Sequence, residues 1–222
     1  MIRAAVFDFD GVVLESVEIK TVAFRRLFAD HPEGERMVEY HRANGGVSRF
    51  EKFRWFYEEV RGEAITEARS VTLGDDFSAL VLDEVRRCAF VPGAHELLER
   101  LAAEIPLFVA SGTPEDELRG IVEHRGLAGL FTGVYGSPPT KAQILRRIIA
   151  DHGVDAGDLV FVGDAMTDFD GAAGAGVPFV GRVPDGQPSP FPDGTFWVRD
   201  LARLDAEWAR LETQPPPVPA VR

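Results

Sequence analysis

From Val91 onward, short apolar runs alternate with segments that carry a helical pattern. The apolar runs predict strands at residues 105–110, 131–135, 159–162, 178–180 and 196–198. The segments between and after them predict helices at residues 94–104, 114–125, 141–151, 168–175 and 200–211. Because a right-handed crossover between parallel strands needs a helix, this alternation favours an α/β fold with a doubly wound, mostly parallel sheet.

A first strand is predicted at the N-terminus, where the apolar run Ala4 to Phe7 ends in Asp8 and Asp10, followed by Gly11. Strand residues two apart point to the same face, so these two carboxylates converge. Open α/β sheets bind ligands at the carboxyl ends of their strands. Two like charges there are costly unless a cation lies between them or one is protonated. The pattern alone is also compatible with a polar loop after an edge strand.

Other chemically useful residues follow the later strands: Ser111, Lys141, Asp164 and Asp168. Phosphoryl transfer through an aspartyl-phosphate needs a carboxylate nucleophile, a divalent cation, groups that bind the phosphoryl oxygens and an acid for the leaving oxygen. Taken singly, Ser111 could be a helix cap, Lys141 a surface charge and Asp164 a turn residue. Together, each just past a strand, they favour a phosphoryl-transfer site.

Residues 17–89 carry apolar side chains at helical spacing, broken at Gly45-Gly46. We therefore predict an all-helical cap over 17–89, inserted after the first strand of an α/β core formed by 1–16 and 90–212. We interpret its aromatic residues as core rather than as a ligand site. The proline-rich segment 213–222 is predicted to be disordered.

Bulk properties exclude several classes of function. The chain has 222 residues and a formal net charge of −12, which disfavours nucleic acid or an anionic membrane as a partner. A single cysteine, Cys88, allows no internal disulfide. We see no charged leader before an apolar segment and no apolar run near 18 residues, so we expect a cytoplasmic protein without a membrane span.

These motifs together resemble the haloacid dehalogenase superfamily of phosphohydrolases. Asp8-Phe-Asp10-Gly-Val is similar to the first motif of that family, and Gly163-Asp164-Ala-Met-Thr-Asp168 to the fourth. Ser111 and Lys141 match the second and third, each a single residue. The position of the helical insertion also looks like the family's cap. The resemblance implies a Rossmann-like α/β core with an inserted helical cap.

The resemblance also implies roles for individual residues. Asp8 would be the nucleophile that carries the phosphoryl group, and Asp10 the general acid and then the base. Mg²⁺ would be held by Asp8, the backbone carbonyl of Asp10, Asp164 and, directly or indirectly, Asp168. The phosphoryl oxygens would be bound by Ser111, the backbone at Gly112 and Lys141.

Three features of the sequence bear on the reaction. Asp10 argues against dehalogenases, which lack the second carboxylate, and against phosphonate-cleaving relatives. The segment Gly46-Val-Ser-Arg49 looks like the cap of β-phosphoglucomutases, in which the arginine grips the non-transferring phosphate. The fourth motif is more similar to that of phosphatases. We predict a Mg²⁺-dependent phosphomonoesterase acting on a sugar phosphate or similar small metabolite; a sugar phosphomutase and a catalytically inactive binding protein stay open as alternatives.

Polar residues cluster beside the Gly45-Gly46 break: Asn44, Ser48, Arg49 and Lys52. If this turn faces the core, they can touch a polar substrate, and Arg49 is the predicted substrate-binding residue. Ser48 and Glu51 also fit a capping box at a solvated helix start. Both interpretations can hold at once.

Overall fold

Six parallel strands form one sheet in the computed structural model, which describes residues 1–220. The strands are β1 (Ala4–Phe7), β2 (Leu107–Pro114), β3 (Gly133–Ser137), β4 (Leu159–Gly163), β5 (Phe179–Arg182) and β6 (Trp197–Val198). Their order is β3-β2-β1-β4-β5-β6, with every neighbouring pair parallel. The chain therefore winds outward from β1 in one direction and then in the other, which confirms the predicted doubly wound sheet.

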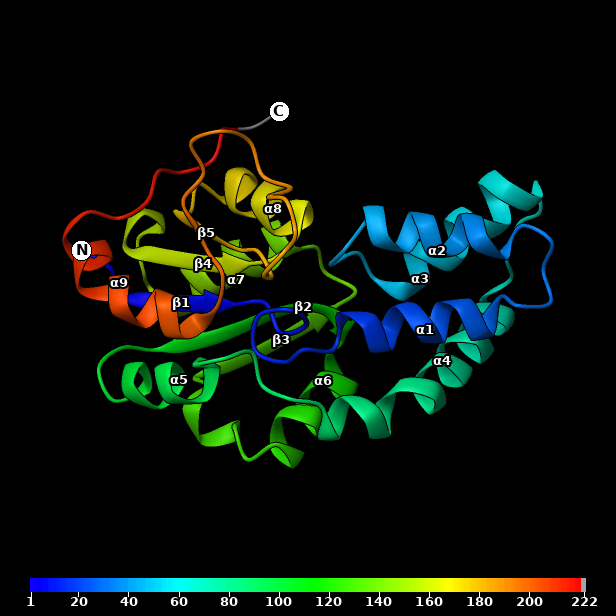
Figure 1. Cartoon of the computed structure of the whole chain (residues 1–222), viewed down its shortest axis with the longest axis horizontal. Coiled ribbons are helices and arrows are strands. Elements are labelled where there is room, and N and C mark those ends of the chain that lie inside the picture. The colour runs from blue at the N-terminus through cyan, green and yellow to red at the C-terminus, as the bar shows by residue number, and fades with distance from the viewer. Residues whose placement is uncertain (221–222) are drawn as a thin grey trace.

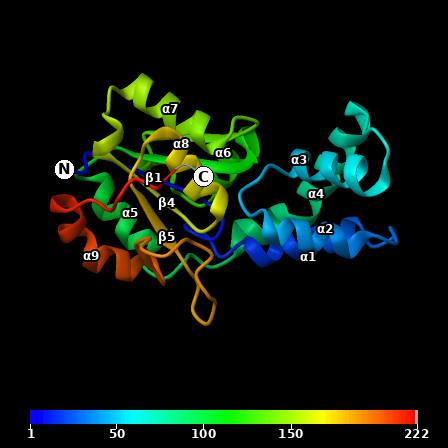
Figure 2. The same cartoon turned by 90° about the horizontal axis from the view of Figure 1, so that it is seen from above.

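Helices cover both faces of this sheet (Figures 1 and 2). They are α5 (Ala94–Ala102), α6 (Glu115–His124), α7 (Lys141–His152), α8 (Met166–Ala175) and α9 (Leu201–Thr213). Apolar side chains of α5, α6 and α9 pack with Phe7 and Val109 in one cluster. Those of α7 and α8 pack with Val6 and Phe108 in another. Successive strand residues thus point to opposite layers, as the pleat requires.

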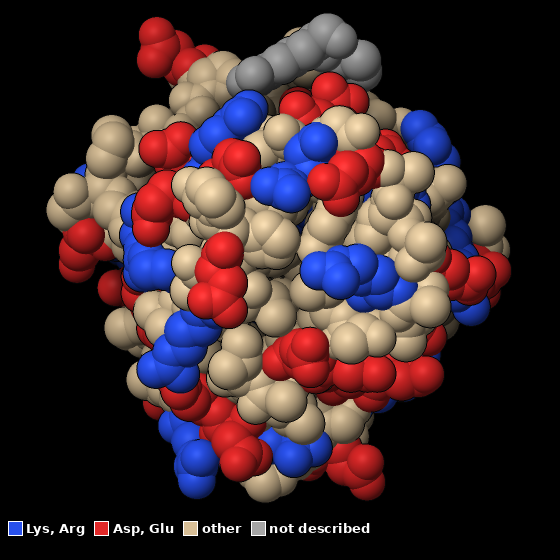
Figure 3. All heavy atoms as spheres, turned by 90° about the vertical axis from the view of Figure 1, so that its right-hand side faces the viewer, with Lys and Arg blue, Asp and Glu red and all other residues tan. Residues whose placement is uncertain are grey.

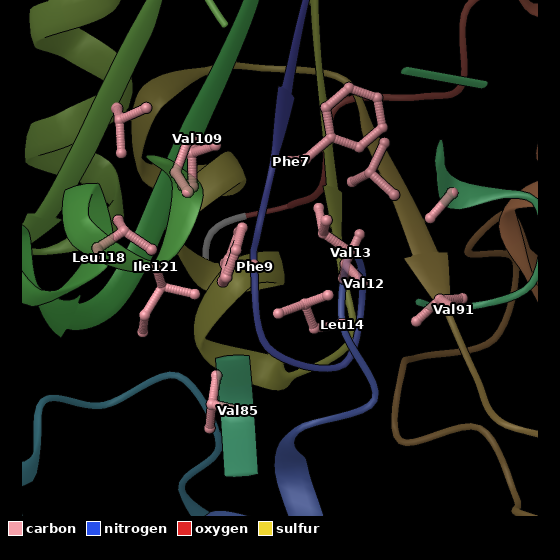
Figure 4. Packing of buried hydrophobic residues seen from close by; sticks show 14 of the residues in the cluster. Phe7, Phe9, Val12, Val13, Leu14, Val85, Val91, Val109, Leu118 and Ile121 are labelled. Carbon is pink, nitrogen blue, oxygen red and sulfur yellow. The ribbon is translucent and has the colours of Figure 1, made fainter. Parts of the chain in front are cut away.

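Strand β1 lies at the centre of the molecule, paired with β2 on one side and β4 on the other. All four of its residues are buried, which explains why its sequence is continuously apolar rather than alternating. Figure 4 shows Phe7, Phe9 and Leu14 among the buried side chains around this strand and the turn that follows it. The carboxyl end of β1 is therefore held from several sides.

A group of helices extends beyond the carboxyl end of β1, on the right of Figure 1. It contains α1 (Val17–Leu27), α2 (Gly34–Ala43), α3 (Arg49–Trp55), the π-helix η1 (Phe56–Arg61) and α4 (Glu67–Arg87). Its interior holds buried aromatic rings, among them Phe24, Phe28, Phe53, Phe56 and Phe77. The spacing of these aromatic residues along the sequence therefore reflects how they pack inside this group of helices. Lysine and arginine alternate with acidic side chains over the outer face of this group (Figure 3).

Several predicted boundaries need correction. Strand β2 runs on to Pro114 because that residue pairs with Ser137 across an irregularity in the ladder, so α6 begins at Glu115 and not at Pro114. Helix α8 begins at Met166, before the predicted start at Asp168. After α9, residues 214–220 form neither helix nor strand; the rest of the predicted disordered tail, 221–222, lies outside the described residues, and its disorder stays a prediction. Among the described helices, none combines the length and apolarity needed to cross a membrane.

Candidate active site

The turn after β1 brings the first aspartates to the edge of the sheet where the winding direction reverses. Asp8 is 2% exposed, and its Oδ1 accepts a hydrogen bond of 2.7 Å from the backbone of Phe9. Gly11 has φ of +76°, and a Cβ there would lie 2.1 Å from Oδ2 of Asp164. Only glycine combines that backbone conformation with the space that Asp164 needs.

Three carboxylates from different segments meet at this edge. Each of Asp8, Asp164 and Asp168 offers an oxygen that lies within 4.8 Å of those of the other two. Asp164 follows β4, and Asp168 lies in the first turn of α8, where its Oδ2 accepts a 3.1 Å hydrogen bond from the backbone of Ala165. Residues more than 150 positions apart are thereby gathered around one point.

Lys141 is the cation within this acidic cluster. Its Nζ lies 2.7 Å from Oδ1 of Asp8 and 2.9 Å from Oδ1 of Asp168, and it donates a 2.5 Å hydrogen bond to the carbonyl of Ala110. It occupies the first position of α7, which Thr140 caps, with Gln143 completing a capping box. Burial disfavours its ammonium, but Asp168 and Asp8 outweigh that effect and raise the pKa of Lys141. Lys141 is therefore charged, and its ammonium contacts Asp8, Asp168 and the Ala110 carbonyl.

One ammonium does not balance three carboxylates, of which Asp8 and Asp168 are buried and Asp164 is partly exposed. Burial, together with Asp168 and Asp10, raises the pKa of Asp8 to about 7 despite the attraction of Lys141. Burial, then Asp8 and Asp168, also raises the pKa of Asp164 well above its usual range. The raised pKa values mean that these carboxylates cannot all ionise beside one ammonium without a further cation. All their donor atoms are carboxylate oxygens, the ligands that Mg²⁺ prefers. The residues fit a divalent cation.

Asp10 has a different environment, dominated by a residue that sequence reasoning missed. Lys20 of α1 donates to Oδ2 of Asp10 and, at 2.7 Å, to Oγ1 of Thr113; Ser16 and Thr113 donate to the same carboxylate at 2.6 and 3.0 Å. Burial raises the pKa of Asp10, but Lys20, Ser16 and Thr113 outweigh it and lower that pKa to about 2. The signal for Lys20 was its position four residues before Phe24, on the buried face of α1.

Two cavities lie where helices α1 to α4, called the cap helices from here on, approach the aspartates. A smaller one, of about 70 Å³, is lined by Asp8, Asp10 and Asp164. A larger one, of about 330 Å³, is lined by Ser111 and Lys141. The residues that border both are Gly46, Val47 and Gly112. Gly112 allows close contact there, since a Cβ on it would lie 2.2 Å from the carbonyl oxygen of Gly46.

Comparison with known proteins identifies the family of a chain with this arrangement. Residues 2–176 match the family model described as haloacid dehalogenase-like hydrolase. The chain belongs to the haloacid dehalogenase-like hydrolases. It is 31% identical over 191 residues to a phosphoglycolate phosphatase of Rhodospirillum rubrum, an alignment that covers 81% of this chain and 79% of that one. A phosphoglycolate phosphatase of Synechococcus elongatus is 25% identical over 181 residues, covering 79% of this chain and 81% of its own.

Solved structures support the same fold. A β-phosphoglucomutase from Clostridium difficile superposes with a TM-score of 0.78 at 18% identity, covering 96% of this chain and 98% of that chain. A predicted phosphoglycolate phosphatase from Haemophilus somnus gives a TM-score of 0.68 at 19% identity, covering 95% of this chain and 97% of its own. The haloacid dehalogenase-like fold and a phosphatase activity are thereby shown for this chain.

In this haloacid dehalogenase-like hydrolase, Arg49 lines the smaller cavity, but its guanidinium is already paired. Its two terminal nitrogens lie 2.5 and 3.1 Å from the carboxylate of Glu117 on α6, and Ser78 of α4 accepts at 2.7 Å. The guanidinium also stacks over the ring of Phe77, 4.5 Å from its centroid. Arg49 therefore joins the cap helices to α6; its predicted contact with substrate stays a prediction.

The start of α3 differs from the predicted capping box. Ser48 occupies the N-cap position, but its side chain makes no capping hydrogen bond, and its buried Oγ has no hydrogen-bond partner among the described residues. Glu51 instead receives hydrogen bonds of 3.0 Å from Arg54. The capping-box prediction is wrong because Ser48 faces the larger cavity instead of the end of the helix.

Proposed function

We propose that this hydrolase is a Mg²⁺-dependent phosphomonoesterase that acts on a small phosphorylated metabolite through an aspartyl-phosphate on Asp8. The observation that carries the proposal is the buried cluster of Asp8, Asp164 and Asp168 around Lys141. A carboxylate nucleophile, a divalent cation and a fixed ammonium are the parts that phosphoryl transfer requires. The curated relatives that carry the name phosphoglycolate phosphatase support the same class of reaction.

Mg²⁺ would be held by the carboxylates of Asp8, Asp164 and Asp168, with the backbone carbonyl of Asp10 as a further ligand. When bound, the ion would neutralise the phosphoryl oxygens and stabilise the ionised form of Asp8. Lys141 keeps the nucleophilic carboxylate oriented, because its Nζ contacts Asp8, Asp168 and the Ala110 carbonyl at the same time. Ser111 and the backbone at Gly112 would contact the phosphoryl oxygens from the side of the larger cavity.

Asp10 would act as acid and then as base. Its ionised form, which Lys20 stabilises, suits the second half-reaction, in which a base takes a proton from the water that hydrolyses the aspartyl-phosphate. The first half-reaction needs Asp10 protonated. Lys20 must therefore separate from Asp10, or pass a proton to it, when the substrate's leaving oxygen arrives.

Hydrolysis is favoured over phosphomutase action by the contacts of Arg49. In the mutase interpretation this arginine grips a second phosphate, whereas here Glu117 occupies both of its terminal nitrogens. The 18% identity to the Clostridium difficile mutase concerns the fold alone. Incubation with a hexose 1-phosphate separates the two activities: a phosphatase releases free phosphate, and a mutase produces the 6-phosphate.

The proposal is tested by phosphate release from p-nitrophenyl phosphate and from phosphoglycolate. We expect turnover with Mg²⁺, none after chelation, and recovery when Mg²⁺ is returned. Asp8→Asn should abolish turnover with little change in the circular dichroism spectrum, because it alters a single atom of a buried side chain. Turnover that survives in Asp8→Asn would contradict the nucleophilic role of Asp8.

A further inference from the structure

Three cationic side chains line the smaller cavity: Lys20, Arg49 and Lys52. Two of them have carboxylate partners, since Lys20 binds Asp10 and Arg49 binds Glu117. Lys52 of α3 has none within the described part of the chain. Its Nζ lies 2.9 Å from Nδ1 of His41 on α2, and 5.6 Å from the centroid of the Phe24 ring.

Lys52 is buried, with 2% of its surface exposed, and the groups around it do not neutralise it. Burial, then Lys20, lowers the pKa of Lys52 to about 7, and the more distant Asp10 compensates only in part. Burial, then Lys52 and Lys20, lowers the pKa of His41 to about 3, so the imidazole is neutral and accepts a hydrogen bond from the amine. An ammonium without a counter-charge in such a place is unfavourable unless an anion arrives with the ligand.

We propose that Lys52 binds a carboxylate of the substrate, so that the site selects short phosphorylated carboxylic acids over phosphate esters that carry no second charge. This rests on the proposed phosphatase function and adds the chemical class of the leaving group. The phosphoryl group would lie at Asp8 and Asp164, and the carboxylate at Lys52, which lines the same smaller cavity.

The size of the cavity limits what lies between the two ends. About 70 Å³ is far below the roughly 300–1,000 Å³ of pockets for drug-sized ligands. Its cap-side walls include the apolar side chains of Val17, Phe24 and Phe77. A backbone of two or three carbons fits this space, whereas a hexose ring is too large for it with the cap helices in their present position.

A matched pair of substrates tests the role of Lys52 in the full-length protein with Mg²⁺. Phosphoglycolate and 2-hydroxyethyl phosphate are similar in length, and only the former has a carboxylate. We expect the wild type to prefer phosphoglycolate in kcat/KM by roughly 10- to 100-fold, the range that one hydrogen bond between charged groups supports. Lys52→Met should remove this preference by raising the KM for phosphoglycolate. The kcat/KM for 2-hydroxyethyl phosphate should change less than about threefold.

Two further variants control for effects on the fold. Arg54→Met removes an exposed cation from the same helix, α3, and should leave both substrates unchanged. Lys52→Gln keeps a polar group beside His41 and should lose the preference as Lys52→Met does. Because these changes remove an unpaired buried charge, neither Lys52 variant should lower the melting temperature.

The outcomes separate this inference from the proposed function. Three outcomes would overturn the role of Lys52 but leave the proposed phosphatase function intact. They are equal kcat/KM for the two esters in the wild type, an equal loss for both in Lys52→Met, and a preference for a hexose bisphosphate. If no ester is hydrolysed, the proposed function fails. Calorimetric binding of the same two esters then decides about Lys52: a carboxylate preference that Lys52→Met removes supports its role, and equal affinities overturn it.

Discussion

Arg49→Met should destabilise the protein much more than Arg54→Met, although both residues lie on α3. The Arg49 and Glu117 side chains are only 4% and 12% exposed and form two hydrogen bonds across the contact between cap and core. Removing one partner of a buried pair leaves the other charge uncompensated, at a cost of about 3–5 kcal/mol. Arg54 and Glu51 are 52% and 55% exposed, so their pair contributes about 0–1 kcal/mol.

These costs translate into melting temperatures that differ clearly. For a chain of this size, 1 kcal/mol shifts the melting temperature by about 2–4 °C. We expect a drop of roughly 10 °C for Arg49→Met and at most a few degrees for Arg54→Met, measured by calorimetry or circular dichroism. Glu117→Gln should resemble Arg49→Met, and the double variant should cost less than the two single changes added together. Equal shifts for Arg49→Met and Arg54→Met, or strict additivity, would refute this reasoning.

The same variants decide how Arg49 affects catalysis. If Arg49 joins cap to core, Arg49→Met and Glu117→Gln should change KM in the same direction, because each breaks the same contact. If Arg49 instead binds the substrate, Glu117→Gln frees its guanidinium, so KM should fall in that variant and rise in Arg49→Met. Steady-state kinetics on phosphoglycolate distinguish the two, with Arg54→Met as the control.

Three further predictions concern charge at the site. Mg²⁺ at 100 times its Kd should stabilise the wild type by about 2.7 kcal/mol and Asp164→Asn much less, as thermal shifts would show; equal stabilisation would argue against this metal site. Because burial raises the pKa of Asp8 to about 7, Mg²⁺ binding should release protons below that pH, and the affinity for Mg²⁺ should weaken roughly fivefold from pH 7 to 6. Calorimetry in two buffers measures both the affinity and the proton release. An affinity independent of pH would contradict the prediction. The pKa of Asp10 lies at about 2 in the folded protein, below its usual value of 3.8. This group therefore stabilises the fold above about pH 4 and loses that contribution, roughly 2 kcal/mol, as the pH falls through 2. The stability difference between wild type and Lys20→Met should therefore narrow from pH 7 to pH 3 in urea titrations, and a constant gap would count against the Lys20–Asp10 pair.

The parts of the fold that sequence could predict are those with a local signal. Strand β1 is apolar at every position because both its faces are covered, and a polar residue directly after such a run marks the strand's end. Parallel strands bring their ends to one edge, so Asp8 and Asp164 could be expected together before any coordinates. Strand β2 shows the limit of this logic. Its last four residues, Ser111 to Pro114, are two polar residues, a glycine and a proline, a composition typical of a loop, yet they continue the strand beside β3.

The contacts that sequence could not predict join a cap helix to a distant segment. Lys20, Arg49 and Lys52 are charged residues on helices, and such residues are usually solvated. Which of them is buried depends on where the cap helices lie against the core. The partner of Arg49, Glu117, lies 68 positions away on α6 and follows no motif. Local periodicity identifies the apolar face of each helix but contains no information about these cross-domain pairs.

The charges of the smaller cavity also indicate how a substrate could add to the contacts between the cap helices and the core. Lys20–Asp10 and Arg49–Glu117 pair the cap helices with the core, and Thr167 donates a 2.5 Å hydrogen bond to the carbonyl of Gly45. These contacts hold the cap helices against the core. Lys52 differs from these two pairs, because its buried amine has no carboxylate partner among the described residues. A substrate carboxylate at Lys52 would supply the missing counter-charge, whereas a neutral ester would leave the amine unpaired.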